Sequence, residues 1–246
     1  MGAMNGMVRL AAIGDMHVTK SGQGSLTSIF AQVSEQSDLL VMCGDLTDYG
    51  LPDEARVLAR EVSSALRVPC VAVLGNHDYE AGKAEEIHQI LVDAGITVLD
   101  GDTCESHGIG FAGVKGFCGG FGRGVLGPWG EDAVKLFVRE AVNEAFKLES
   151  ALARLRSAHR VALLHYSPVR ATVEGEPLEI FPYLGCSRLE EPLARYPVTA
   201  VIHGHAHNGA LEGRTNAGTP VYNVAMPLLR KCWPERSPFR VIEIGG

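Results

Sequence analysis

The stretch Ala200-Val-Ile-His-Gly-His-Ala-His-Asn208 joins an apolar run to three closely spaced histidines. An apolar run that stops abruptly at polar side chains is typical of a buried strand that presents them at its C-terminal edge. His203, His205 and His207 alternate with glycine and alanine, so in an extended backbone they would share one face. We expect a metal site here, against the alternative of a histidine-bearing loop without a ligand. A metal needs further ligands, which the rest of the chain must supply.

The composition predicts a cytoplasmic protein with one domain over residues 1–246. With 46% apolar residues, 246 residues can bury one sizeable core. Lys plus Arg is 22 and Asp plus Glu is 29, so the net charge of −7 argues against nucleic acid as a partner. No apolar run approaches the roughly 18 residues of a membrane span, and the N-terminus does not read as a secretory signal. The six cysteines form no C-x-x-C pair, which favours buried thiols in a reducing compartment. We expect residues 1–6 to be disordered or a vector remnant, with Met7 as the natural start.

Apolar runs and helical patterns alternate along the chain. This rhythm is typical of a layered α/β fold with parallel strands, in which sites form at the C-terminal ends of the strands. The expected strands are 8–13, 39–43, 71–74, 96–99, 160–164, the run from 200, 221–225 and 239–244. The expected helices are 25–35, one from Pro52, 83–94, 131–157 and 187–196.

Residues 109–130 hold nine glycines and break this rhythm. The pattern G-x-G-x-x-G occurs at 122–127, but Pro128 follows directly and no helix opens, so we discount dinucleotide binding by an oxidoreductase. We predict a flexible loop that borders a site, with residues 113–130 able to close over it. Arg123 is then the candidate to contact an anionic substrate, against the alternative of a solvated surface arginine.

The predicted helix 131–157 carries a stripe of small and apolar residues at alternating spacings of four and three. Such a stripe either packs on the sheet of its own domain or forms a coiled seam with a second chain. We expect the intramolecular packing and keep a homodimer as the alternative.

Side chains that can bind a metal follow five of the expected strands. Carboxylate, amide and imidazole groups together suit Mn, Fe, Co, Ni or Zn. The absence of cysteine among them argues against a structural thiolate site. The candidates are Asp15, His17, Asp45, Asn76, His77, His165, His205 and His207.

The ordered set of these motifs resembles the calcineurin-like metallophosphoesterases. That family has D-x-H, G-D-x-x-D, G-N-H-D or G-N-H-E, a lone H and G-H-x-H in this order. Each motif is weak alone, but five in order are specific. The resemblance implies a four-layer α/β/β/α sandwich of two mixed sheets flanked by helices. The matching segments are Asp15-Met-His17, Gly44-Asp-Leu-Thr-Asp48, Gly75-Asn-His-Asp78, His165 and Gly204-His-Ala-His207.

The resemblance also implies a hydrolase with two divalent metal ions, among which manganese is favoured. A hydroxide between the ions would attack phosphorus in line. One ion would be held by Asp15, His17 and His207. The other would be held by Asn76, His165 and His205, with Asp45 bridging both.

By the same resemblance, His77 is the catalytic histidine, which stabilises the phosphoryl group or protonates the leaving oxygen. Asp48 would orient that imidazole, against the alternative of a simple turn residue. His203 is expected to support the site without binding metal.

The G-N-H-D form and the small size resemble the bacterial cyclic-nucleotide phosphodiesterase branch. This favours a phosphodiesterase on a small nucleotide-like phosphoester. Those relatives often carry a second histidine where Tyr166 stands, so a phosphomonoesterase on a small metabolite is the alternative. A non-catalytic binding scaffold on the same fold is disfavoured, because every ligand candidate and His77 are present.

Overall fold

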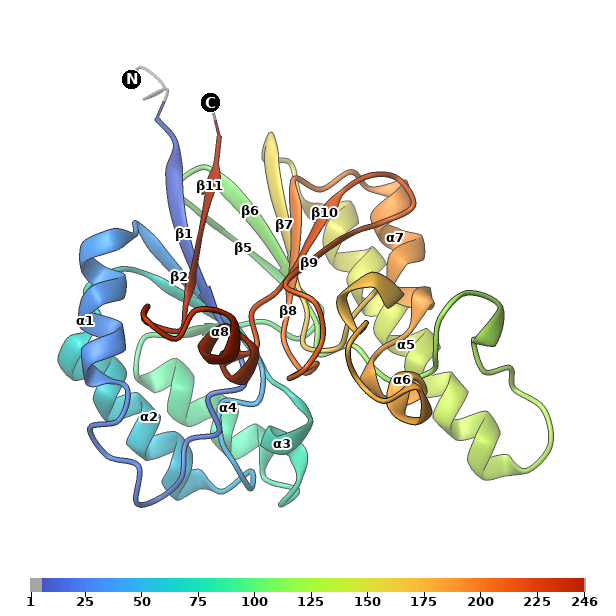
Figure 1. Ribbon diagram of the computed structural model, residues 1–246, viewed down its shortest axis with the longest axis horizontal. Coiled ribbons are helices and arrows are strands. Elements are labelled where there is room, and N and C mark those ends of the chain that lie inside the picture. The colour runs from blue at the N-terminus through green and yellow to red at the C-terminus, as the bar shows by residue number, and fades with distance from the viewer. Residues whose placement is uncertain (1–5, 246) are drawn as a thin grey trace.

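Two stacked β-sheets with helices outside both form the computed structural model, which describes residues 6–245 (Figure 1). The first sheet has the strand order β11-β1-β2-β3-β4, and the second has β5-β6-β7-β8-β10-β9. In both sheets the central strands run parallel, whereas β11, β5 and β9 pair antiparallel with their neighbours. Both sheets are therefore mixed.

The strands are short, as their bounds show. The first sheet contains β1 (Val8–Ile13), β2 (Leu39–Cys43), β3 (Cys70–Val73), β4 (Thr97–Val98) and β11 (Arg240–Ile244). The second contains β5 (Asp102–Ser106), β6 (Ile109–Gly113), β7 (His159–Leu163), β8 (Ala200–His203), β9 (Glu212–Arg214) and β10 (Pro220–Asn223).

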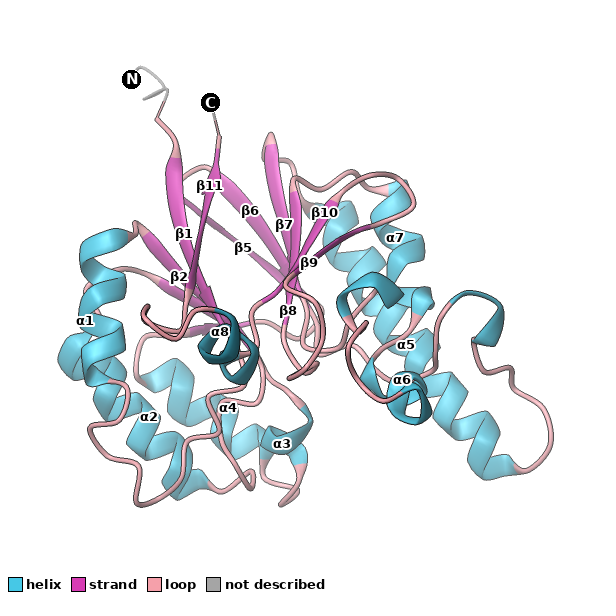
Figure 2. Ribbon diagram, viewed as in Figure 1, coloured by secondary structure: helices cyan, strands magenta, loops and turns pink. Residues whose placement is uncertain are grey.

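Helices form the two outer layers, and short helices lie at the end to which the parallel strands point (Figure 2). Those outside the first sheet are α1 (Thr27–Gln36), α2 (Pro52–Ala65) and α4 (Ala84–Asp93). Those outside the second are α5 (Asp132–Arg154) and α7 (Glu190–Arg195), the latter preceded by the 3-10 turn η4 (Ser187–Leu189). The short elements are α3 (Asn76–Tyr79), η1 (Gly122–Gly124), η2 (Arg170–Thr172), η3 (Leu178–Ile180), α6 (Phe181–Leu184) and α8 (Met226–Cys232).

The strands are continuous apolar runs because both of their faces are buried. Ala11 and Ile13 of β1 face the core under α1, α2 and α4, whereas Leu10 and Ala12 face the second sheet. Phe111 of β6 faces the first sheet in the same way. The layers therefore follow the order α/β/β/α, as expected.

The apolar stripe of α5 packs on the outer face of the second sheet. Leu148 and Leu152 contact the core formed there with Ala112, Ala162 and Val201. This confirms the expected intramolecular packing of the stripe.

The predicted loop 109–130 is wrong over its first five residues, which form the buried strand β6. Its glycines serve close packing rather than flexibility. A Cβ on Gly110 would lie 2.7 Å from Ser157 Oγ, and one on Gly113 would lie 2.7 Å from the Leu99 side chain. Glycine composition predicts a loop, but here it reflects lack of space.

The helix predicted from Pro52 is confirmed, and it fixes the loop that contains Asp48. The carboxylate of Glu54 accepts hydrogen bonds from the backbone N–H groups of Tyr49 (2.9 Å) and Leu51 (3.2 Å). An acidic side chain in the first turn of a helix is favoured in this role.

Two expectations from the sequence concern membrane-spanning helices and the first six residues of the chain. Within residues 6–245, no helix is long and apolar enough to cross a membrane. The expectation for residues 1–6 lies outside the described residues except at Gly6.

Candidate metal centre

Loops that follow five parallel strands meet at one end of the two sheets. Backbone hydrogen bonds join them: Asp15 N–H donates to Gly44 O (2.9 Å), and His17 N–H donates to Asp45 O (3.0 Å). Gly204 N–H donates to His165 O (3.2 Å), which links the loops after β8 and β7. The fold thus brings together side chains from residues 15 to 207.

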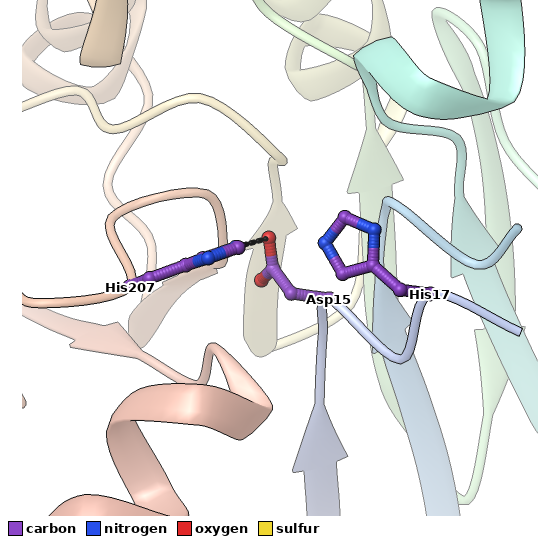
Figure 3. Close-up of side chains that lie close together, drawn as sticks. All are labelled: Asp15, His17 and His207. Atoms are coloured by element: carbon purple, nitrogen blue, oxygen red, sulfur yellow. Dashed lines mark hydrogen bonds and ion pairs between the residues drawn. The ribbon is translucent and has the colours of Figure 1, made fainter. Parts of the chain in front are cut away.

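Asp15, His17 and His207 form a first cluster whose candidate ligand atoms lie within 4.8 Å of one another. Figure 3 shows Asp15 at the end of β1 between the two imidazoles. His207 Nε2 lies 3.0 Å from Asp15 Oδ1. The carboxylate is also held by the backbone N–H of His205, at 2.9 Å from each oxygen.

Asp45, His165 and His205 form a second cluster by the same criterion. Asn76 lies beside it, with its Oδ1 2.9 Å from His165 Nε2. Asp45 Oδ1 is 3.4 Å from His165 Nε2, and its Oδ2 is 3.9 Å from His17 Nε2. One carboxylate oxygen of Asp45 therefore faces each cluster.

The outward-facing ring nitrogens of His165 and His205 assign the tautomers of these two imidazoles. His165 Nδ1 lies 3.0 Å from the carbonyl of Cys43, and His205 Nε2 lies 3.1 Å from the carbonyl of Tyr183. A carbonyl only accepts hydrogen bonds, so these nitrogens carry the protons. The opposite nitrogens, His165 Nε2 and His205 Nδ1, would then offer their lone pairs to a metal, which His165 Nε2 would share with Asn76 Oδ1.

His17 lies beside a carboxylate, and one of its ring nitrogens has no hydrogen-bond partner. Its Nδ1 lies 3.2 Å from Asp48 Oδ1, whereas its Nε2 is buried and lacks a hydrogen-bond partner within the described residues. Buried polar atoms without partners are rare in proteins. A cation held by the first cluster would satisfy this nitrogen.

The electrostatics also favour bound cations. Burial, together with the charges of Asp15 and Asp78, raises the pKa of Asp45 to about 9. Burial lowers the pKa of His205 to about 3 and that of His165 well below its ordinary value. Imidazoles that remain neutral keep a lone pair for a metal, and a bound cation would offset the charge of the crowded carboxylates. The donor set fits such ions.

The backbone of the clusters is strained. Asp15 (φ 55°), His17 (φ 45°), Asp45 (φ 48°) and His205 (φ 69°) all lie in the left-handed region. Non-glycine residues seldom adopt this conformation, and they concentrate at functional sites when they do. The positive φ of His205 is also why the three histidines after β8 do not share one face.

Asp78, which the sequence analysis left without a role, connects the loops after β2 and β3. Its buried carboxylate accepts hydrogen bonds from the backbone N–H groups of Gly75 (2.8 Å) and Thr47 (2.8 Å), and from Thr47 Oγ1 (2.6 Å). It therefore sets the spacing between Asp45 and Asn76. Its position as the last residue of the G-N-H-D motif is the feature of the sequence that could have indicated this role.

The expected pairing of the Asp48 carboxylate with His77 is absent. His77 Nδ1 lies 2.6 Å from the backbone carbonyl of Asp48, while the Asp48 carboxylate contacts His17. Because α2 begins close by, the loop turns its carbonyl and not its side chain toward His77. His77 also belongs to a third group of possible ligands, with His17 and Asp45.

Two other candidates lie outside the clusters. Arg123 lies in η1 and lines a separate hollow with Arg170 and Arg214. The imidazole of His203 contacts the carbonyl of Gly204 (2.8 Å) and Thr172 Oγ1 (2.8 Å), which supports the loop rather than the clusters.

Comparison with known proteins agrees with this arrangement. A sequence profile described as "Calcineurin-like phosphoesterase" matches residues 8–209, a range that contains both clusters. The chain is 23% identical over 239 residues to UDP-2,3-diacylglucosamine hydrolase of Klebsiella pneumoniae subsp. pneumoniae, covering 87% of this chain and 88% of that relative. It is 38% identical over 61 residues to glycerophosphodiester phosphodiesterase GpdQ of Enterobacter lignolyticus, covering 25% of this chain and 22% of that relative.

Solved structures show the same fold. Phosphopantetheinyl hydrolase (PptH) of Mycobacterium tuberculosis superposes with a TM-score of 0.67 at 13% identity, covering 97% of each chain. TT1561 of Thermus thermophilus gives a TM-score of 0.55 at 12% identity, covering 98% of this chain and 99% of that one. These similarities confirm the expected sandwich of two mixed sheets.

Proposed function

Because this chain belongs to the calcineurin-like phosphoesterase family, hydrolases of phosphoric esters, we propose that it is a phosphodiesterase with a dinuclear metal centre. The observation that carries the proposal is the position of Asp45, whose carboxylate oxygens face two separate His/Asp clusters. A carboxylate so placed can bridge two cations.

In this proposal the two clusters hold one ion each. Divalent cations at such a site stabilise the charge on the phosphoryl group and lower the pKa of a water molecule. Manganese is the proposed metal, from the group that suits mixed oxygen and nitrogen ligands. Asp15, His17 and His207 would hold the first ion, and Asn76, His165 and His205 the second.

His77 is the proposed general acid. Its Nδ1–H donates to the Asp48 carbonyl, and the Glu80 carboxylate lies 3.5 Å from the same nitrogen. The ring is thereby oriented, and its Nε2 is the atom left to deliver a proton to the leaving oxygen. The His77 ring also packs edge to face with the His17 ring, with centroids 4.6 Å apart.

The proposed substrate is a small nucleotide-like phosphodiester. The G-N-H-D motif supports this choice, as does the 61-residue similarity to a relative named glycerophosphodiester phosphodiesterase. The net charge of −7 argues against a nucleic-acid substrate.

The test compares bis-p-nitrophenyl phosphate with p-nitrophenyl phosphate on chelated enzyme before and after addition of Mn²⁺. We expect turnover only after addition, with the higher kcat/KM for the diester. A preference for the monoester would instead indicate a phosphomonoesterase. Turnover that chelation leaves unchanged would contradict the metal mechanism.

A further inference from the structure

A cavity of about 490 Å³ lies between the start of α5, α6 and the loop around residue 126. Its wall is mainly apolar, with Leu126, Val134, Phe137 and Pro182, and its charged member is Glu179. This volume lies within the range of small-ligand pockets. None of the residues assigned to the metal centre lines it, so the proposed function leaves it unused.

The cavity is joined to the metal centre through α6. Tyr183 lines the cavity, and its backbone carbonyl accepts the hydrogen bond from His205 Nε2 (3.1 Å). The neighbouring carbonyl of Pro182 accepts from Gly119 N–H (2.7 Å), and Gly119 O accepts from Leu126 N–H (2.8 Å). The same segment thus orients a proposed metal ligand and builds the cavity wall.

Exposed apolar side chains concentrate in the segments that border this cavity. Of the eleven large exposed ones in residues 6–245, five lie within 129–136 and 178–183. They include Trp129 (66% exposed), Leu178 (65%) and Tyr183 (60%). An exposed apolar surface of this kind marks a binding site more often than chance.

We propose that this cavity binds an apolar alkyl or aryl group of the phosphoester substrate. This rests on the proposed function, since the phosphorus would lie at the metal centre while the apolar group passes Tyr183. The volume of about 490 Å³ suits a small group rather than a second copy of the chain. A stable self-interface buries about 800 Å² on each partner, far more than the wall of a cavity of this size.

The test uses p-nitrophenyl diesters whose second alcohol is methyl, butyl or octyl, kept below their micelle concentrations. Each methylene that becomes fully buried raises kcat/KM by about fourfold, because its transfer contributes roughly 0.8 kcal/mol. We expect kcat/KM of the Mn²⁺-loaded enzyme to rise at least about tenfold from methyl to octyl. A flat dependence on chain length would overturn the proposal.

Val134→Asp is the informative variant. Val134 is the third residue of α5, where an acidic side chain is compatible with the helix dipole. We expect this variant to lose the dependence on chain length and to hydrolyse the methyl diester like wild type. Phe146→Asp is the matched control, because Phe146 is 61% exposed on the same helix and does not line the cavity. Equal losses in both variants would overturn the proposal.

Binding measurements separate this proposal from the proposed function. Calorimetry with octyl phosphate and methyl phosphate needs no turnover, so it applies even if no diester is hydrolysed. Tighter binding of octyl phosphate, lost in Val134→Asp, supports the cavity on its own. Equal binding of both ligands would overturn the proposal. A wild-type dimer that Val134→Asp converts to a monomer would show a self-interface and would also overturn it.

Discussion

At the scale of single residues, the centre depends on the atoms that face away from it. Two of the proposed ligands donate their outer N–H to a carbonyl, His165 to Cys43 O and His205 to Tyr183 O, whereas His17 Nδ1 lies 3.2 Å from the Asp48 carboxylate. These partners fix the ring orientation and raise the basicity of the inner nitrogen. Two of them are backbone carbonyls, so no side-chain pattern reveals them.

Asp48→Asn should weaken metal binding without disabling His77. The neutral amide lacks the charge that the carboxylate places 3.2 Å from His17 Nδ1, so metal affinity should fall by about 10–100-fold. His77 is held by the backbone carbonyl, which the substitution retains. We therefore expect kcat near the wild-type value at saturating Mn²⁺, measured in a metal titration of activity.

The opposite result would restore the pairing first expected from the sequence. If kcat stayed low at saturating Mn²⁺ with unchanged metal affinity, the carboxylate of Asp48 would act through His77.

His77→Ala should separate catalysis from metal binding. Loss of a general acid typically costs about 10²–10⁴-fold in rate. We expect such a loss in kcat, with about two metal ions per chain retained by elemental analysis. His88→Ala, which removes a half-buried imidazole on α4, should leave both quantities unchanged. Loss of metal in His77→Ala would make His77 a ligand, as its grouping with His17 and Asp45 permits.

At the scale of elements, the glycines at the strand ends let the loops approach one another. A Cβ on Gly204 would lie 2.3 Å from Asp15 Oδ2 and 2.9 Å from Cys43 O. Neither atom can move away easily, because Asp15 is hydrogen-bonded to His205 and Cys43 ends β2. The G-H-x-H motif thus needs glycine for space beside the first cluster.

Gly204→Ala should displace Asp15 and so damage the first cluster. A shift of about 1 Å at a catalytic site can cost about 10²-fold in rate, and we expect a loss of that order. Gly124→Ala is the control, since no heavy atom lies within 4 Å of its added Cβ. The rate of diester hydrolysis and the metal content should be measured for both variants. Wild-type metal content and rate in Gly204→Ala would contradict the close packing described.

Which elements the sequence predicts depends on how they are buried. Strands such as β1 and β2, apolar on both faces, and helices with a clear stripe such as α5 are evident from periodicity. The edge strands β5 and β9 are polar, because solvent covers much of their surface, and they leave no such pattern. Strand β6 was missed because its glycines resemble a loop.

At the scale of the whole molecule, the centre lies where the two sheets meet. Gly14 N–H after β1 donates to Val224 O after β10 (2.9 Å), and Met226 N–H donates back to Gly14 O (2.9 Å). The loops of the first sheet carry Asp15, His17, Asp45 and Asn76, and those of the second carry His165, His205 and His207. Bound metal would therefore join the two sheets.

Removal of metal should lower thermal stability because metal binds the folded chain. A ligand at 1,000 times its Kd stabilises by about 4.1 kcal/mol. For a domain of about this size, each kcal/mol shifts Tm by roughly 2–4 °C, so chelation should lower Tm on the order of 10 °C. Scanning calorimetry of metal-loaded and chelated protein measures the shift. An unchanged Tm would show that the metals do not couple the sheets.

The candidate ligands could be predicted from the sequence because each follows a buried strand, and parallel strands bring their ends to one edge. The hydrogen bonds that orient these ligands could not be predicted from the sequence. The segment that holds Tyr183 is irregular, and its carbonyl meets His205 only through the tertiary fold. The choice between the carbonyl and the carboxylate of Asp48 depends on a loop conformation that residue types do not specify.

The most direct measurement is the metal content and diesterase rate of wild type and Asp45→Asn after loading with Mn²⁺. With Asp45 between the clusters, wild type should bind about two ions per chain, and activity should saturate only with the second. Asp45→Asn should lose both ions and nearly all turnover. One ion per chain at full activity, or Asp45→Asn at the wild-type rate, would contradict a dinuclear centre bridged by Asp45.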